Sequence, residues 1–200
     1  MTLTTILVVL FVLAVLGAIA GGIALLILRG WAKQVLDGNG FSATPVDATK
    51  VERFLAQEAT FVVTVAREFT HPPDKVWQTL QLNGTFSWIP LFNGIRYAED
   101  YRTEGALRTF DGLLAAVQEQ VITAIPRRQL TLTATKVSVP LALKSLVEDY
   151  RLTETPSGTT TLRWTIAVRP RLGAFLPLRW AAPLARPFLA YGIKGLSTRL

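Results

Sequence analysis

Hydrophobic and polar positions divide the chain into an unbroken apolar run, a long alternating region and a closing stretch with helical spacing. The apolar run, TILVVLFVLAVLGAIAGGIALLIL, covers residues 5–28 and contains no charged side chain. At the rise of an α-helix it extends over about 36 Å, enough to cross a hydrocarbon layer of ~30 Å. It lacks the basic leader of a signal peptide and exceeds the usual apolar core of about 7–15 residues. We therefore predict that residues 1–30 form a transmembrane anchor.

From residue 59 the hydrophobic period changes to two, which is typical of half-buried strands. In TFVVTVAREF, residues Phe61, Val63, Val65 and Phe69 fall on one side. The same alternation predicts strands near 95–97, 107–110, 115–125, 130–135, 145–155 and 159–169. One side of these strands is apolar, so we predict a curved antiparallel sheet with one face that must be covered.

Helical spacing appears in four segments after the anchor. Asp47 is expected to cap a short helix in ATKVERFLAQEA, and the prolines after His71 start a helix that places Val76, Trp77 and Leu80 on the core. A short helix is expected in TFSWIPLF, and a longer one in 174–200, bent by its two prolines. The last helix is the available cover for the sheet. The expected fold is α+β, a curved antiparallel sheet wrapped on a C-terminal helix, with one preceding transmembrane helix. Residues 31–58 are expected as a juxtamembrane linker and 59–200 as the folded domain.

Charge is concentrated near the C-terminus, where no acidic side chain follows Glu154. The basic residues of this segment are Arg163, Arg169, Arg171, Arg179, Arg186, Lys194 and Arg199, and they supply the whole net charge of +7. Aromatic residues are interleaved with them, which favours an anionic membrane surface over nucleic acid as a partner; a solvated helix face is the alternative. Arg29 and Lys33 follow the apolar run, and the positive-inside rule then places the domain on the cytoplasmic side of a single-pass protein.

Several kinds of chemistry are excluded or unsupported by composition. The chain has no cysteine and a single histidine, His71, so neither a disulfide framework nor a usual zinc site is expected. No phosphate-binding glycine loop, dinucleotide fingerprint or GxSxG motif occurs. We expect no metal and no cofactor, and we interpret His71 as a loop residue at a strand–helix corner.

Charged side chains on the apolar side of the strands are the candidate site. By parity Arg67 lies beside Val65 and Phe69, and Glu119 and Glu148 lie on apolar sides of their own strands. Buried ions are costly unless they are paired, so these three are expected to form a polar cluster, with Arg108 and Tyr150 as further members. Three roles remain open: contact with the polar head of an apolar ligand, catalysis with a glutamate as general base, and a structural ion pair. The predicted ligand-binding residues are Arg67, Arg108, Glu119, Glu148, Tyr150, Trp164 and Phe188; no catalytic residue is assigned.

The order of these elements resembles a known superfamily. The matching segments are VAREFTHPPDKVWQTL, WIPLFNGI, EGALRTFDG, AVQEQVITAIPRRQLTL, SLVEDYRLTETPSGTTTLRWTIAV and GIKGLSTRL. Together they resemble the START/Bet v 1-like (SRPBCC) superfamily, and within it the polyketide cyclase/dehydrase and lipid-transport group. The resemblance implies a helix-grip fold with a hydrophobic cavity between the sheet and the C-terminal helix. Family members bind lipids, sterols, polyketides, isoprenoid quinones or hormones, and some are cyclases or aromatases.

Anchor and resemblance together suggest a function. We expect membrane-anchored binding or transport of a hydrophobic small molecule, such as a lipid, an isoprenoid or a polyketide-like compound. The alternative is a cyclase- or aromatase-type enzyme that uses Glu, Arg and Tyr side chains in the same cavity. Binding is favoured over catalysis, because no complete catalytic constellation is visible in the sequence.

Overall fold

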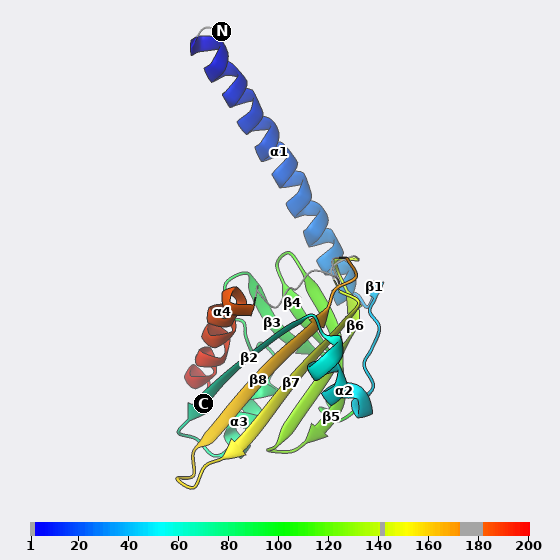
Figure 1. The fold of residues 1–200 in the computed structure, drawn as a ribbon, viewed down its shortest axis with the longest axis vertical. Coiled ribbons are helices and arrows are strands. Elements are labelled where there is room, and N and C mark those ends of the chain that lie inside the picture. The colour runs from blue at the N-terminus through cyan, green and yellow to red at the C-terminus, as the bar shows by residue number, and fades with distance from the viewer. Residues whose placement is uncertain (1–2, 141–142, 173–181) are drawn as a thin grey trace.

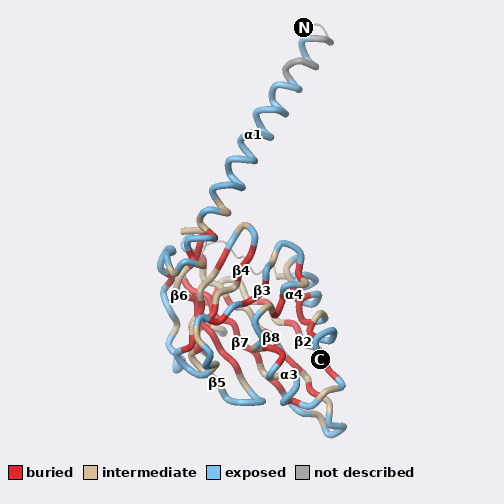
Figure 2. The backbone as a smooth tube through the Cα atoms, turned by 180° about the vertical axis from the view of Figure 1, so that it is seen from behind, coloured by how far each residue is buried: buried red, intermediate tan, exposed pale blue. Residues whose placement is uncertain are grey.

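The computed structural model describes residues 3–140, 143–172 and 182–200, which form one projecting helix and one curled sheet with helices on its concave side (Figure 1). Helix α1 (Leu3–Leu36) runs away from the domain and meets it only at its C-terminal end. Within Leu10–Leu36, its most apolar 18-residue stretch has a mean hydropathy of 2.8, and the helix is long and apolar enough to cross a membrane. Exposed positions follow α1 until its last turns reach the sheet (Figure 2).

The sheet is antiparallel throughout, in the order β2-β8-β7-β6-β5-β4-β3, with the short β1 paired to β6. Its strands are β1 (Phe41–Ser42), β2 (Phe61–Phe69), β3 (Phe92–Tyr97), β4 (Leu107–Gly112), β5 (Ala116–Ile125), β6 (Gln129–Val137), β7 (Ser145–Glu154) and β8 (Thr160–Arg169). The predicted fold class, a curved antiparallel sheet with a C-terminal helix, is confirmed. Alternation located seven of these strands because one side of each is buried.

Two helices pack against the concave side, α3 (Pro73–Leu80) and α4 (Ala182–Gly195). Helix α3 begins at Pro73, where the missing amide costs no hydrogen bond, and it buries Val76 and Leu80. Helix α4 buries Leu189 and Ile193 and accommodates Pro187 within its length. A 3-10 turn (Leu196–Thr198) follows it. Residues 174–181 of the predicted closing helix lie outside the described residues.

The short helix expected in TFSWIPLF is not formed. This segment consists of turns, in which Phe86 and Leu91 have φ angles of 69° and 68°. Thr85, at the start of this segment, donates its side-chain hydroxyl to the carbonyl of Thr79 at 2.9 Å. A left-handed conformation at Phe86 is incompatible with a continuing right-handed helix, and it turns this side chain into the core.

The segment between α1 and β2 lies on the domain rather than free of it. Asp47 caps a short helical run, as predicted, by accepting the amide of Thr49 at 2.9 Å. The run comprises a 3-10 turn (Ala48–Lys50), α2 (Val51–Arg53) and a π-helical turn (Phe54–Glu58). Phe54 and neighbouring apolar residues pack on Val147 and Ala167, which face away from α4. Residues 31–58, expected as a linker, therefore cover part of the convex face.

Candidate functional site

Four buried polar side chains from three strands form a connected network on the concave side of the sheet. Arg108 on β4 lies directly opposite Glu119 on β5, and its Nε donates to Glu119 Oε2 at 2.7 Å. Its Nη2 donates to Glu148 Oε2 on β7 at 2.7 Å and lies 3.4 Å from the hydroxyl of Tyr150. Tyr150 in turn donates its hydroxyl to Glu148 Oε2 at 2.6 Å. Arg108 is thus the cation that joins the two carboxylates.

The strand between the carboxylates leaves room for this contact. Strand β6 separates β5 from β7, and its residue opposite Glu119 is Ala134. A small side chain here allows the Arg108 guanidinium to reach over β6 to Glu148. The charged atoms are almost wholly inaccessible, with side-chain exposures of 1%, 1% and 7% for Arg108, Glu119 and Glu148.

Burial perturbs the protonation of this network. Burial by itself lowers the pKa of Arg108, but the neighbouring carboxylates outweigh it and raise the pKa well above its usual value. Desolvation raises the pKa of Glu119 to about 7, although Arg108 acts in the opposite direction. Burial, reinforced by the adjacent carboxylate of Glu148, also raises the pKa of Tyr150 well above 10, so its phenol remains a hydrogen-bond donor at neutral pH. Glu119 is therefore poised to exchange a proton near neutrality.

Two further buried polar atoms near the network have no hydrogen-bond partner among the described residues. They are the hydroxyl of Tyr97 and Nε1 of Trp164. Tyr97 lies opposite Arg108 in the β3–β4 register, and the Trp164 ring stacks on Tyr150 with centroids 5.4 Å apart. A buried polar group without a partner costs about 1–3 kcal/mol, so such groups usually meet water or a ligand. The interior thus offers unused hydrogen-bonding capacity next to an ionic network.

Aromatic side chains fill the described space between the sheet and α4. Phe86 stacks on Trp164 with ring centroids 4.9 Å apart, and Leu189 and Ile193 join the same buried cluster from α4. An open groove of about 1010 Å³ lies instead at the end of the sheet between the start of α3 and the β5–β6 turn. Among the described residues, these side chains thus pack together in the region where a cavity beneath α4 is expected.

A tight contact holds α4 in place. Trp88 Nε1 donates to the carbonyl of Gly192 at 2.9 Å, and its indole lies against Gly195. A Cβ atom built at Gly195 would lie 1.9 Å from Trp88 Nε1, so no larger residue fits there without movement. The missing side chain of Gly195 therefore makes room on α4 for the Trp88 ring, which the carbonyl of Gly192 holds by a hydrogen bond.

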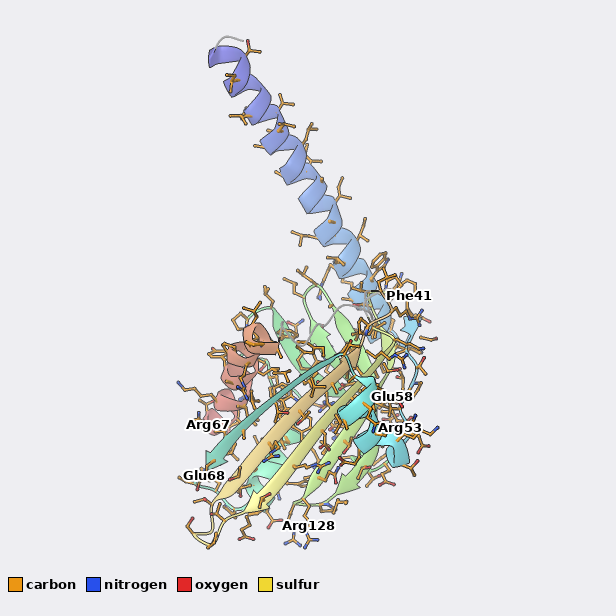
Figure 3. The ribbon with its side chains drawn as sticks, in the orientation of Figure 1. Phe41, Arg53, Glu58, Arg67, Glu68 and Arg128 are labelled. Atoms are coloured by element: carbon orange, nitrogen blue, oxygen red, sulfur yellow. The ribbon has the colours of Figure 1, made fainter. Side chains whose placement is uncertain are left out.

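The structure brings together Arg108, Glu119, Glu148 and Tyr150 of the predicted site residues, with Trp164 stacked on Tyr150. Arg67 lies elsewhere, on the edge strand β2 beside α4 (Figure 3), and its Nε is buried without a partner among the described residues. Phe188 is 42% exposed, and its ring contacts Phe92 rather than the network.

Sequence reasoning missed three residues of the site, Tyr97, Phe86 and Trp88. Tyr97 could have been found by parity, because it lies two residues after Ile95 on the strand expected at 95–97 and so shares its face. Phe86 and Trp88 could not have been found in this way, because the segment whose turns direct them inward was expected to be a helix. His71 contributes only its backbone carbonyl, which accepts the Thr160 hydroxyl at 2.7 Å. In the described part of the chain, no group of three potential metal-ligating side chains comes together.

Comparisons with known proteins agree with this geometry. Residues 60–200 match a family model described as "Polyketide cyclase / dehydrase and lipid transport". No curated protein matches the sequence.

Solved structures share the fold at low sequence identity. A START superfamily protein from Mycobacterium smegmatis has a TM-score of 0.57 and 13% identity, over 69% of this chain and 97% of that chain. Ara h 8.0201 has a TM-score of 0.52 and 17% identity, over 69% and 97% of the two chains. A protein from Mesorhizobium loti has a TM-score of 0.51 and 19% identity, over 68% and 94%. At these identities the similarity establishes the fold alone.

Proposed function

Because the chain belongs to the polyketide cyclase/dehydrase and lipid-transport family of the START/Bet v 1-like superfamily, whose fold binds hydrophobic ligands, we propose that it is a membrane-anchored carrier of such a ligand. The guest occupies the space between the sheet and α4, with its polar end at the network of Arg108, Glu119, Glu148 and Tyr150. Lipids, isoprenoids and polyketide-like molecules have this combination of a long apolar part and a small polar end.

The observation that carries the proposal is the pair of unpartnered buried polar atoms, Tyr97 Oη and Trp164 Nε1. Both are surrounded by an apolar core, and both lie on side chains adjoining the ionic network. Polar atoms of a ligand that reached them would satisfy two groups that the protein leaves unsatisfied. Ligand sites commonly combine an apolar lining with a few such polar groups.

Entry of a ligand requires α4 or the aromatic rings beneath it to move, because the described interior is filled. Helix α4 is suited to such a displacement: it lacks the amide of Pro187, and the contact of Trp88 with Gly192 and Gly195 is a localised attachment. The stacked rings of Phe86, Trp164 and Tyr150 would then separate and line the guest.

Helix α1 supplies the membrane anchor in this proposal. A buried core helix is disfavoured, since the most apolar 18-residue stretch of α1 is 0% buried. A cleaved signal sequence is disfavoured because the end of the same helix belongs to the domain: Ala32 and Val35 are buried against Ala116 on β5. Arg29 and Lys33 at this end favour the cytoplasmic side for the domain, by the positive-inside rule. The basic C-terminal segment then faces an anionic lipid surface.

A cyclase- or aromatase-type enzyme is the second candidate, and one observation favours it. A glutamate whose pKa is about 7 can act as a general base or acid at neutral pH, and Glu119 has this property. Two observations argue against an enzyme: the carboxylates of Glu119 and Glu148 already bind Arg108, and the Glu119 side chain is 1% exposed. The Glu119→Gln variant separates the two: an enzyme loses turnover of its substrate while binding is retained, whereas a carrier has no turnover to lose.

Replacement of Tyr97 by phenylalanine tests the carrier directly. The substitution removes only an atom that has no hydrogen-bond partner among the described residues, so it should leave the stability of the empty protein unchanged or slightly higher. The full chain and the variant are purified from membranes, and bound lipids are extracted and identified by mass spectrometry. We expect the variant to retain less of a specific lipid species. Tyr101→Phe, on the exposed β3–β4 connection, is the matched control and should retain the normal amount. Equal, non-selective lipid content in all three proteins would contradict the proposal.

A further inference from the structure

The end of the apolar helix is joined directly to the edge of the sheet. Arg29, the first charged residue after the apolar run, donates from Nη1 to the carbonyl of Leu113 at 3.4 Å and lies 4.0 Å from Asp111 Oδ1. Asp111 is fully buried and also accepts Arg96 Nη2 at 2.8 Å. With Ala32 packed on Ala116, these contacts fix α1 to the β4–β5 connection rather than leave it on a flexible tether.

Exposed apolar side chains gather at the same edge. The amide of Leu113 donates to the carbonyl of Leu91 at 2.7 Å, so the β4–β5 turn and the start of β3 lie side by side. Leu113 is 42% exposed and Leu91 is 64% exposed. Leu91 also has a φ of 68°, an unfavourable backbone conformation for leucine, so a strained turn presents an apolar side chain to the exterior.

Helix α4 extends this surface. The Phe188 ring lies 5.6 Å from that of Phe92, the residue after Leu91, and Leu184 is one helical turn before Phe188 at 83% exposure. We call Leu91, Leu113, Leu184 and Phe188 the apolar rim. Figure 1 shows that the β4–β5 turn and the start of α4 both face the side of the domain from which α1 projects.

We propose that the apolar rim inserts into the interfacial layer of the bilayer that α1 spans. This inference rests on the membrane anchor of the proposed function. The first arginine after a transmembrane run lies at headgroup depth, so Leu113, which Arg29 contacts, is held at that depth. Arg29 itself, whose side chain is 32% exposed beside Leu113, supplies a cation that suits anionic headgroups. The partner of the rim is therefore a lipid surface.

Single-cysteine variants test this placement, since the chain has no cysteine of its own. The full chain is reconstituted in phosphatidylcholine–phosphatidylglycerol vesicles with an NBD label at Val15→Cys in α1, Leu113→Cys on the rim, or Ser157→Cys. Ser157 lies in the β7–β8 turn, and strands of ten residues put it roughly 30 Å from the rim end of β8. Nitroxide-labelled lipids should quench the label at positions 15 and 113 and leave that at 157 unchanged.

The outcomes distinguish the rim from the anchor. Quenching at 15 with none at 113 would overturn the rim insertion and leave the anchor standing. Absence of quenching at 15 would contradict the anchor of the proposed function, and the inference with it. Concentration-dependent disulfide formation between copies through residue 113, without quenching there, would show that a second copy covers the rim and would also overturn it.

A charge placed on the rim gives an independent test that avoids an apolar label at Leu113. With the label at Leu91→Cys, the added substitution Leu113→Asp should abolish quenching at 91 while leaving that at 15 unchanged. Tyr101→Asp is the control: it places the same charge on an exposed residue beyond the other end of β3 and should have no effect. Equal quenching with and without Leu113→Asp would contradict insertion of the rim.

Discussion

The buried carboxylate of Glu119 gives stability a specific pH dependence, which Glu119→Gln should remove. Its pKa in the folded protein is about 7, compared with 4.5 for an ordinary glutamate, because burial disfavours the charged form. Between these values the folded protein holds a proton that the unfolded chain has released. Stability therefore decreases as the pH rises through this window and is constant with respect to this group outside it.

The size of the effect follows from the difference between the two pKa values. At 1.36 kcal/mol for each pH unit, this group removes about 3 kcal/mol of stability between pH 4 and pH 8. Glutamine keeps an acceptor for Arg108 Nε and leaves Arg108 paired with Glu148, but it cannot ionise. The variant should gain about 3 kcal/mol relative to the wild type over that pH range.

Denaturant unfolding of the full chain in detergent micelles, followed by tryptophan fluorescence, measures this difference. Trp164 stacks on Tyr150 within the site and reports its disruption. Glu154→Gln, at the exposed end of β7, controls for the loss of a carboxylate as such. Parallel stability–pH curves for the wild type and Glu119→Gln would refute the reasoning, because they would show that Glu119 is equally charged in the folded and unfolded states.

Other substitutions test the remaining contacts. Arg108→Met should destabilise the protein by about 3–5 kcal/mol at neutral pH, since it leaves two buried carboxylates without their cation; urea unfolding that shows less than 1 kcal/mol would contradict this. Gly195→Ala would ordinarily stabilise a helix by about 0.5–1 kcal/mol, and Gly195 has a permissive φ of −64°. Here we expect a loss of about 1–3 kcal/mol because the new methyl overlaps Trp88, and Trp88→Ala in the same chain should relieve most of it in a double-mutant cycle. Trp88→Phe should cost about 1 kcal/mol through the lost bond to Gly192 and should increase hydrogen exchange in α4 before other elements.

Alternation predicted the sheet well because its two faces differ in polarity. Leu130 and Leu132 enter the core from β6, whereas Thr131 and Thr133 lie on the other face, and this contrast is visible in the sequence. The same contrast is absent from TFSWIPLF. Its apolar residues fit a helix equally well. The segment forms turns because Phe86 has a left-handed backbone and the Thr85 hydroxyl bonds to the carbonyl of Thr79.

Parity also found the carboxylates of the network but not their arrangement. It places Glu119 and Glu148 on the concave side, yet it cannot say which cation reaches both, since this depends on the pairing of strands distant in sequence. Arg67 faces the same side from the edge strand β2, and Arg108 occupies the central position because β4 pairs directly with β5. The docking of α1 on the sheet likewise depends on Ala32 and Val35, which resemble a simple continuation of the apolar helix.

Mapping of a photoreactive fatty acid tests the carrier claim most directly. The full chain in membranes is loaded with the probe and irradiated, and the crosslinked peptides are identified by mass spectrometry. A hydrophobic guest beneath α4 predicts modification of strand peptides that contain Tyr97 or Trp164, suppressed by an excess of unlabelled lipid. Crosslinks confined to α1 and the apolar rim, with none on those buried strands, would contradict it.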